Sequence, residues 1–194
     1  MPNWCSNVVE IAHTDPAKLK EVITAFGEGK FCAYAKPIPE GLDIVAGSVG
    51  VKGSPEQDAL EAKEQENLAK HGYKNWYDFC ANEWGTKWDV TDECGCSELA
   101  EGATSTTISF ESAWAPPIGV YEALVEEGFE VRAHYYEPGM AFVGTWDNGD
   151  DQFYEYGGYT SANVTEAIGE DLDEMFGISE AMAEYEEENE EEEE

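Results

Sequence analysis

Residue types that could coordinate a metal ion are few and scattered in this chain. Its 194 residues include five cysteines and three histidines. Cys94-Gly95-Cys96 is the one close pair, whereas a structural zinc site needs a second Cys or His pair at a spacing that lets four ligands converge. His13, His71 and His134 each stand alone in the sequence. We therefore expect no zinc site.

Signatures of nucleophilic or acid–base catalysis are also missing. Cys5 with His13, or Cys80 with His134, would make a nucleophile–base pair, but no Gly-rich turn marks an activated nucleophile. Acid–base work by Asp and Glu needs buried carboxyl groups, and sequence does not show which of the 43 are buried. We predict a protein that is not an enzyme and has no cofactor, and keep a carboxylate hydrolase as a minor alternative.

The segment Asp147-Asn148-Gly149-Asp150-Asp151 is similar to the first half of a calcium-binding loop, in which oxygen ligands alternate around a Gly. No Glu stands at the twelfth position to close such a loop. Asn-Gly between two strand-like segments favours a type I′ hairpin turn. We therefore predict a hairpin here and no metal site.

Charge is the most informative property of the chain. Its 43 Asp and Glu outnumber ten Lys and Arg, which gives a net charge of −33. Residues 166–194 hold 15 of the acidic residues and no Lys or Arg, so residues 1–165 alone still carry −18. Direct binding to nucleic acid needs a basic groove, and binding to anionic membranes needs a basic surface. We therefore expect this chain to bind neither nucleic acid directly nor anionic membranes.

Residues 8–12 are typical of a strand, and Asp15-Pro16 is a helix start. Apolar residues at helical spacing follow as far as Gly27. Residues 36–86 interrupt this pattern as an insertion with a Gly- and Pro-rich loop, a polar helix from residue 54 to about 70, and an aromatic helix over 75–84.

After the insertion, residues 87–91 and 104–110 are expected to form two paired strands. A helix is predicted from Pro117 to Gly128, followed by strands over 129–136, 140–146 and 152–156. Without the insertion, the order β-α-β-β-α-β predicts an α+β, ferredoxin-like split βαβ fold: an antiparallel sheet with both helices on one face and an extra C-terminal hairpin.

We assign residues 1–160 to this domain, 161–185 to an acidic helix and 186–194 to a disordered poly-Glu tail. In the acidic helix an apolar face is predicted from Ile168, Leu172, Met175 and Phe176. Four tryptophans, Trp76, Trp84, Trp88 and Trp114, would suit a base-stacking platform, but the scarcity of Lys and Arg favours a place in the core.

Four blocks in order resemble the YubB-like proteins of bacteriophages and conjugative plasmids, which have a ferredoxin-like domain. The resemblance extends over roughly residues 1–147 and is carried by residues 1–7, 76–89, 113–117 and 136–140. It implies the ferredoxin-like fold and an origin in a mobile element. It brings no activity or catalytic residue to this chain.

Large basic surfaces in cells belong mostly to proteins that bind DNA or RNA. We therefore predict a phage-encoded inhibitor that mimics nucleic acid and binds the basic surface of a host nucleic-acid-binding protein, such as a defence protein. The carboxylates expected to make this contact are Glu122, Glu126, Glu127, Asp147, Asp150, Asp151, Glu155, Asp171, Asp173 and Glu174. The alternative is a non-catalytic adaptor or assembly factor whose charge only gives solubility.

The expected compartment is the host cytoplasm. No run approaches the roughly 20 apolar residues that span a bilayer, and residues 1–7 lack the basic and apolar regions of a signal peptide. An odd number of cysteines without a secretory signal favours reduced thiols. The oligomeric state cannot be predicted from these patterns.

Overall fold

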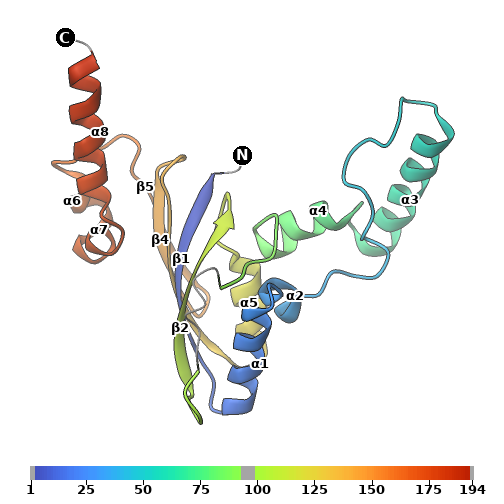
Figure 1. Ribbon diagram of the computed structural model, residues 1–194, viewed down its shortest axis with the longest axis horizontal. Helices are drawn as coiled ribbons and strands as arrows, with labels where there is room; N and C mark the ends of the chain where they lie inside the picture. The colour runs from blue at the N-terminus through green and yellow to red at the C-terminus, as the bar shows by residue number, and fades with distance from the viewer. Residues whose placement is uncertain (1–2, 93–98, 193–194) are drawn as a thin grey trace.

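The computed structural model describes residues 3–92 and 99–192 and has an α+β fold built on one open antiparallel sheet (Figure 1). The strand order is β2-β1-β3-β4-β5. The five strands are β1 (Trp4–Ala12), β2 (Ser105–Ala113), β3 (Glu130–Glu137), β4 (Phe142–Asp147) and β5 (Asp150–Glu155). The α+β class and the antiparallel sheet predicted from the sequence are confirmed.

Three helices, α1 (Pro16–Gly27), α2 (Phe31–Ala35) and α5 (Ile118–Glu126), lie on one face of the sheet. Helix α1 begins as predicted, because Asp15 Oδ1 accepts a hydrogen bond from the Ala17 N–H at 2.9 Å and Pro16 occupies the first turn. Its apolar stripe packs on alternate residues of β1 and β3 to form the main core. The buried residues are Leu19, Val22, Ile23 and Phe26 from α1, Val9 and Ile11 from β1, and Val131, Ala133 and Tyr135 from β3.

The strand predicted over residues 87–91 is wrong, and so is its pairing with β2. Asp89 instead caps α2: its carboxylate accepts hydrogen bonds from the backbone N–H groups of Cys32 and Ala33, at 2.7 and 3.0 Å. Strand β2 pairs with β1 along its whole length. The described chain therefore contains one split unit, β2-α5-β3 with β1 between, and the full ferredoxin-like order is not established.

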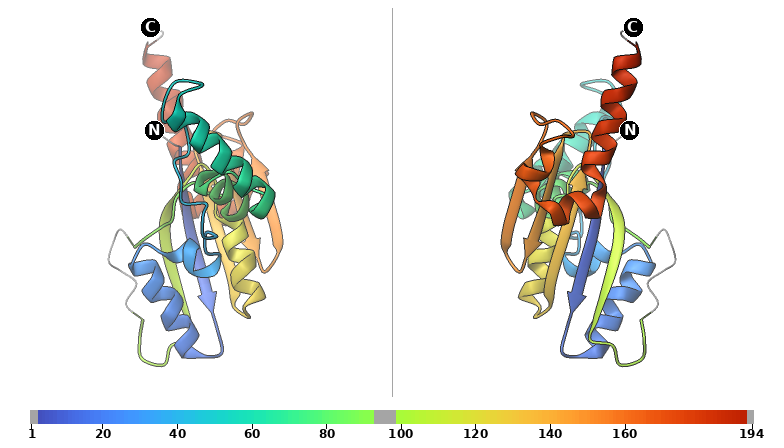
Figure 2. Two further views of the ribbon diagram at one scale, coloured as in Figure 1. Left: turned by 90° about the vertical axis from the view of Figure 1, so that its right-hand side faces the viewer. Right: turned by 90° about the vertical axis from the view of Figure 1, so that its left-hand side faces the viewer.

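Three C-terminal helices, α6 (Val164–Ile168), α7 (Glu170–Phe176) and α8 (Ile178–Glu192), lie on the opposite face of the sheet (Figure 2). They pack on outward-facing residues of the last three strands and make a second, smaller core. Its members include Tyr136, Val143, Tyr154, Val164, Ile168, Leu172 and Ile178.

The single acidic helix expected over residues 161–185 is wrong, because Gly169 and Gly177 break it with φ values of 90° and 63°. Met175, placed on the apolar face by the sequence pattern, is exposed as a result. We expected disorder over 186–194, whereas α8 continues to Glu192 and Glu186 accepts two hydrogen bonds from Ser161, at 2.6 and 2.9 Å.

The predicted insertion contains α3 (Pro55–His71), α4 (Trp76–Phe79) and a π-helix, η1 (Cys80–Trp84). Helix α3 begins at the Ser54 cap, as the sequence indicates, and ends at Gly72 in the left-handed conformation, two residues beyond the predicted end at about residue 70. It projects away from the sheet (Figure 1). The rest of residues 36–86 is no mere surface insertion, because Leu42, Phe79, Cys80 and Trp84 are buried in the main core.

The hairpin between β4 and β5 is confirmed. Asn148 and Gly149 have φ values of 48° and 106°, which is the pair of positive angles that a type I′ turn requires.

Asp173 ties the C-terminal helices together. It is 8% exposed and accepts hydrogen bonds from Thr165 Oγ1 of α6 at 2.5 Å and from the Ser179 N–H of α8 at 2.7 Å. Burial alone raises the pKa of Asp173, but these hydrogen bonds outweigh burial and hold the pKa below its ordinary value. The side chain is thus a structural acceptor.

Replacing Asp173 with Ala should lower the free energy of unfolding by about 1–3 kcal/mol, because two donors lose a buried acceptor. The lowered pKa means that this stabilisation is present above the unfolded-state pKa and is lost as pH falls through the folded-state pKa. Urea unfolding at several pH values measures both effects. The exposed neighbour Asp171→Ala is the control and should change stability by less than about 0.5 kcal/mol; equal losses would contradict this role.

Candidate functional site

One row of side chains across the outer face of the sheet is rich in charge. The strand register aligns Thr107, Glu10, Arg132, Asp147 and Asp150 from β2 through to β5. Neighbouring strands lie about 4.8 Å apart, so the carboxylates of this row are one to three strand spacings from one another.

The same end of the sheet receives carboxylates from the turn that joins α5 to β3. Glu126 and Glu127 end α5, and Glu130 begins β3. The hairpin turn contacts this segment directly, because Val131 N–H donates to Asn148 Oδ1 at 2.9 Å. We call this set the acidic end; it consists of the exposed residues Glu10, Glu126, Glu127, Glu130, Asp147 and Asp150.

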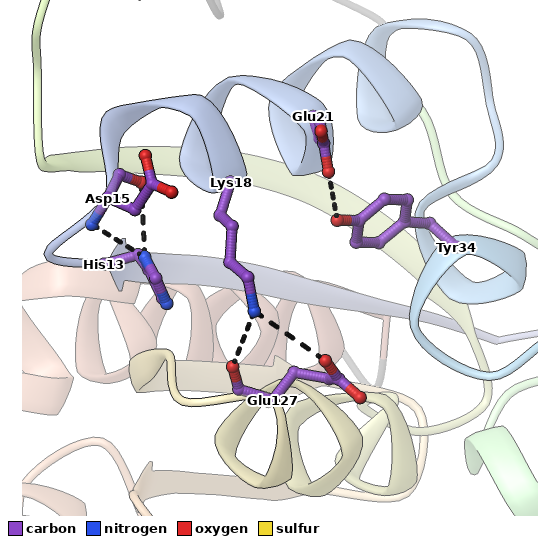
Figure 3. Close-up of polar contacts among 6 residues, drawn as sticks. All are labelled: His13, Asp15, Lys18, Glu21, Tyr34 and Glu127. Carbon is purple, nitrogen blue, oxygen red and sulfur yellow. Dashed lines mark hydrogen bonds and ion pairs between the residues drawn. The ribbon is translucent and has the colours of Figure 1, made fainter.

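Two cations sit within the acidic end and are already paired. Arg132 Nε lies 3.1 Å from Asp147 Oδ2, and Lys18 Nζ lies 3.9 Å from Glu127 Oε2 (Figure 3). Both pairs are largely exposed, so each contributes little to stability. Their effect is to leave the surface net negative and without a free basic group among these residues.

Four of the ten predicted contact residues thus come together: Glu126, Glu127, Asp147 and Asp150. Glu10 and Glu130 were missed by sequence reasoning. The predicted strands contained both residues, but only the register of β1 against β3, which a single sequence does not show, places them here.

The other six predicted residues are elsewhere. Glu122 is exposed one turn earlier on α5, and Glu155 is at the far end of β5. Asp151 accepts a hydrogen bond from the Tyr135 hydroxyl at 2.6 Å. In the C-terminal helices, Asp171 and Glu174 are exposed on α7. The assignment of Asp173 to partner binding is wrong, because that side chain is buried and engaged within the C-terminal helices.

A second cluster occupies the opposite end of the sheet, where β1 begins and β2 ends. Lys87 Nζ lies 4.4 Å from the ring centroid of Trp88, 5.5 Å from that of Tyr77 and 5.4 Å from that of Trp114. Trp4 extends the group, with its ring 6.3 Å from Trp88. We call these five residues the aromatic–lysine patch.

The backbone around the patch is held firmly. Trp114 has a φ of 71°, a left-handed conformation rare for an aromatic residue, and its N–H donates to Asn3 O at 2.9 Å. A Cβ on Gly85 would lie 2.9 Å from Pro116 O, so only glycine allows this close approach. Thr86 Oγ1 and Ala113 then exchange hydrogen bonds at 3.0 and 3.1 Å.

The expectation that all four tryptophans belong to the core is wrong for two of them. Trp84 is buried and Trp76 is half-buried, whereas Trp88 and Trp114 are 41% and 42% exposed. Lys87, adjacent to Trp88 in the sequence, was the available signal: a cation beside an aromatic residue favours ring stacking at the surface.

The described residues contain no assembled site for metal binding or for nucleophilic catalysis. No group of three His, Cys, Asp or Glu there could hold a metal ion. Cys5 is the second residue of β1, whereas His13 follows the end of that strand beside Asp15 (Figure 3), so this pair does not meet. Burial raises the pKa of Cys5 and of Cys80 to about 12 and that of Cys32 well above its ordinary value, so all three thiols stay protonated.

A shallow groove of about 630 Å³ separates α1 from α2. Its lining includes Ala17, Ala25 and Ala33 together with charged residues of both signs. Tyr34 crosses it, with its hydroxyl donating to Glu21 Oε2 at 3.2 Å (Figure 3). No convergent set of polar groups points into this groove, so it carries no catalytic assignment.

The fold and these sites define an acidic α+β protein with two exposed clusters at opposite ends of one sheet. Comparison with known proteins adds little to this description. No protein-family model matches the chain, and no curated protein matches it. The crystal structure of protein api92 from Yersinia pseudotuberculosis, of family DUF1281, is similar with a TM-score of 0.39 and 14% identity. The match covers 82% of this chain and 99% of that one. Within the described residues, no helix combines the length and apolar character needed to cross a membrane.

Replacing Lys87 with Met should lower the free energy of unfolding by about 0.5–2 kcal/mol, because the apolar stem remains and only the cation over the rings is lost. Lys87→Arg should restore most of that loss, since guanidinium also stacks on aromatic faces. Urea unfolding followed by tryptophan fluorescence and by circular dichroism measures the change.

The control is Lys70→Met on α3, which makes the same change in net charge at an exposed lysine. If Lys70→Met and Lys87→Met destabilise equally, the effect is one of overall charge and the aromatic–lysine patch contributes nothing of its own.

Proposed function

We propose that the protein is a non-catalytic binding protein that occupies the basic, nucleic-acid-binding surface of a partner protein by presenting carboxylates in place of phosphates. The observation that carries this proposal is the exposure of the acidic groups. Among the residues whose side chains are described, only Glu137 and Asp173 are buried carboxylates. The negative charge is therefore almost all available to attract and orient a basic partner.

The acidic end supports the proposal best. Its six carboxylates come from five elements and the C-cap of one of them, which the sheet and the main core fix in place, so their spacing does not depend on a flexible loop. A rigid array needs little ordering on binding, and therefore keeps more of its electrostatic attraction as affinity. The carboxylates of α8 lie on a separate helix and would add long-range steering.

The cations of the chain offer no competing basic surface. In the described residues, five of the ten Lys and Arg form ion pairs with carboxylates, and Lys87 lies among aromatic rings. Direct binding of nucleic acid would require a continuous basic groove. Attraction to a basic protein surface is the favoured interaction.

A second candidate function is that of an adaptor, favoured by the aromatic–lysine patch. Trp and Tyr dominate the energetic centres of protein interfaces, and this patch exposes Trp4, Trp88 and Trp114 at one end of the sheet. In this case the charge of the body would keep the protein soluble, and binding would depend on the rings.

We further propose that the chain belongs with the YubB-like proteins of phages and plasmids, that its sheet is a ferredoxin-like arrangement without one edge strand, and that it acts on a protein of the host cell. In support, the split unit β2-α5-β3 has β1 between its strands. The blocks that carry the resemblance also meet around the aromatic–lysine patch: Asn3 and Trp4, Tyr77 with residues 85–88, and residues 113–117.

Capture of partners on the immobilised protein, eluted by rising salt, tests the proposed function. Proteins that elute should bind DNA or RNA, and free nucleic acid should compete with the protein for them. Neutralising the acidic end by Glu126→Gln, Glu127→Gln, Asp147→Asn and Asp150→Asn should weaken binding of such a partner by at least about 10-fold, mainly through slower association.

The matched control neutralises four carboxylates on α8, Glu180, Glu184, Glu187 and Glu188, with the same change in net charge. It should weaken binding much less. Equal losses in the two variants would reduce the effect to net charge, and loss only on Trp88→Ala would favour the adaptor. Partners that bind no nucleic acid would contradict the proposal.

A further inference from the structure

Charge is divided unevenly between the body of the protein and the projecting segment that contains α3. We call residues 36–74 the arm. It holds five Lys and seven Asp or Glu, a net charge of −2, whereas the other 155 residues hold five Lys or Arg and 36 Asp or Glu. Half of all the basic residues thus lie in a fifth of the chain, and the arm is nearly neutral.

Helix α3 makes little use of the body for its packing, whereas Leu42 at the base of the arm is buried in the main core. Helix α3 extends away from the sheet, and Asn67 is the one residue of its 17 that is buried (Figure 1). Asn67 anchors the base of the arm by donating to Gly41 O and Lys74 O, at 2.9 and 3.0 Å. A polar helix that buries so little of its surface is marginal alone in water.

Apolar side chains are exposed where the preceding loop runs beside α3. Val45, Val49 and Val51 are 53%, 45% and 78% exposed, and Leu68 on the helix is 40% exposed. The loop is fixed to the helix, because Gln57 Oε1 accepts hydrogen bonds from Ser48 Oγ and the Val49 N–H, at 3.0 and 3.2 Å. The valines therefore form part of an ordered surface.

We propose that the arm is a self-association surface, through which two copies of this chain bind each other. A symmetric dimer needs a self-complementary patch. Lys52 and Lys70 are interspersed with carboxylates along the arm and can pair with those of a second arm, whereas Lys63 is already paired with Glu66 of its own helix. Outside the arm and the aromatic–lysine patch, each copy presents a surface of mostly like charge, which opposes contact.

The extended position of the arm also suits binding to a second copy of the chain. Contact between two arms keeps the two bodies, each of net charge −31, apart from each other. A basic partner would gain less from the nearly neutral arm than from the acidic end. Self-association does not require the acidic end to bind anything, so it stands or falls independently of the proposed function.

Salt gives a test whose sign distinguishes the two kinds of contact. In sedimentation velocity on the full chain, raising NaCl from about 50 mM to about 500 mM should strengthen dimer formation, because salt screens repulsion between the bodies while apolar contact persists. Binding to a basic partner should weaken over the same range. A chain that remains monomeric at about 100 µM and high salt overturns the proposal.

Val51→Asp on the arm should weaken dimer formation by at least about 10-fold at 500 mM NaCl, because it places a charge in the apolar contact. The control is Met140→Asp, which adds the same charge at a side chain that is 71% exposed on the body. Melting curves for both variants verify that they remain folded. If both substitutions weaken dimer formation equally, or if neither weakens it, the interface does not lie on the arm.

Discussion

Mutual repulsion among 43 acidic residues is the constraint on which the rest of the structure depends. Folding brings these groups closer together, so the core must supply enough apolar burial to offset the repulsion. Aromatic and aliphatic residues of the sheet and of α1, α2 and α5 do so in one contiguous cluster. The two buried carboxylates obey the same constraint: Glu137 accepts hydrogen bonds from the N–H groups of Gly139 and Met140, as Asp173 does from Ser179.

The surface is also divided into regions that differ in charge and in aromatic content. Strand β1 runs from the aromatic–lysine patch at its start to the acidic end at its finish, so the two clusters cannot contact one small partner together. The C-terminal helices cover the outward-facing side chains of Tyr136, Val143 and Tyr154. They leave Glu10 and its row of charged side chains exposed to solvent. The arm then adds a third region with almost no net charge.

Local patterns predicted most of the elements, because their signals are local. The cap at Asp15, the stripe of α1, the Ser54 start of α3, and the Asn148-Gly149 turn each depend on neighbouring residues. The failures came from distant contacts. Asp89 serves α2, some 57 residues away, and so residues 87–91 do not extend the sheet.

The candidate sites followed the same rule. Sequence showed that charge matters but could not place Glu10 in one row with Asp147, since that depends on strand register. Nor could it show that Asp173 turns inward or that Trp88 and Trp114 stay outside the core.

Strand β5 lies at one edge of the sheet and carries Asp150, Asp151 and Glu155. Charges on an edge strand deter pairing with a strand of another chain, so the acidity also guards this protein against aggregation, until low pH removes it.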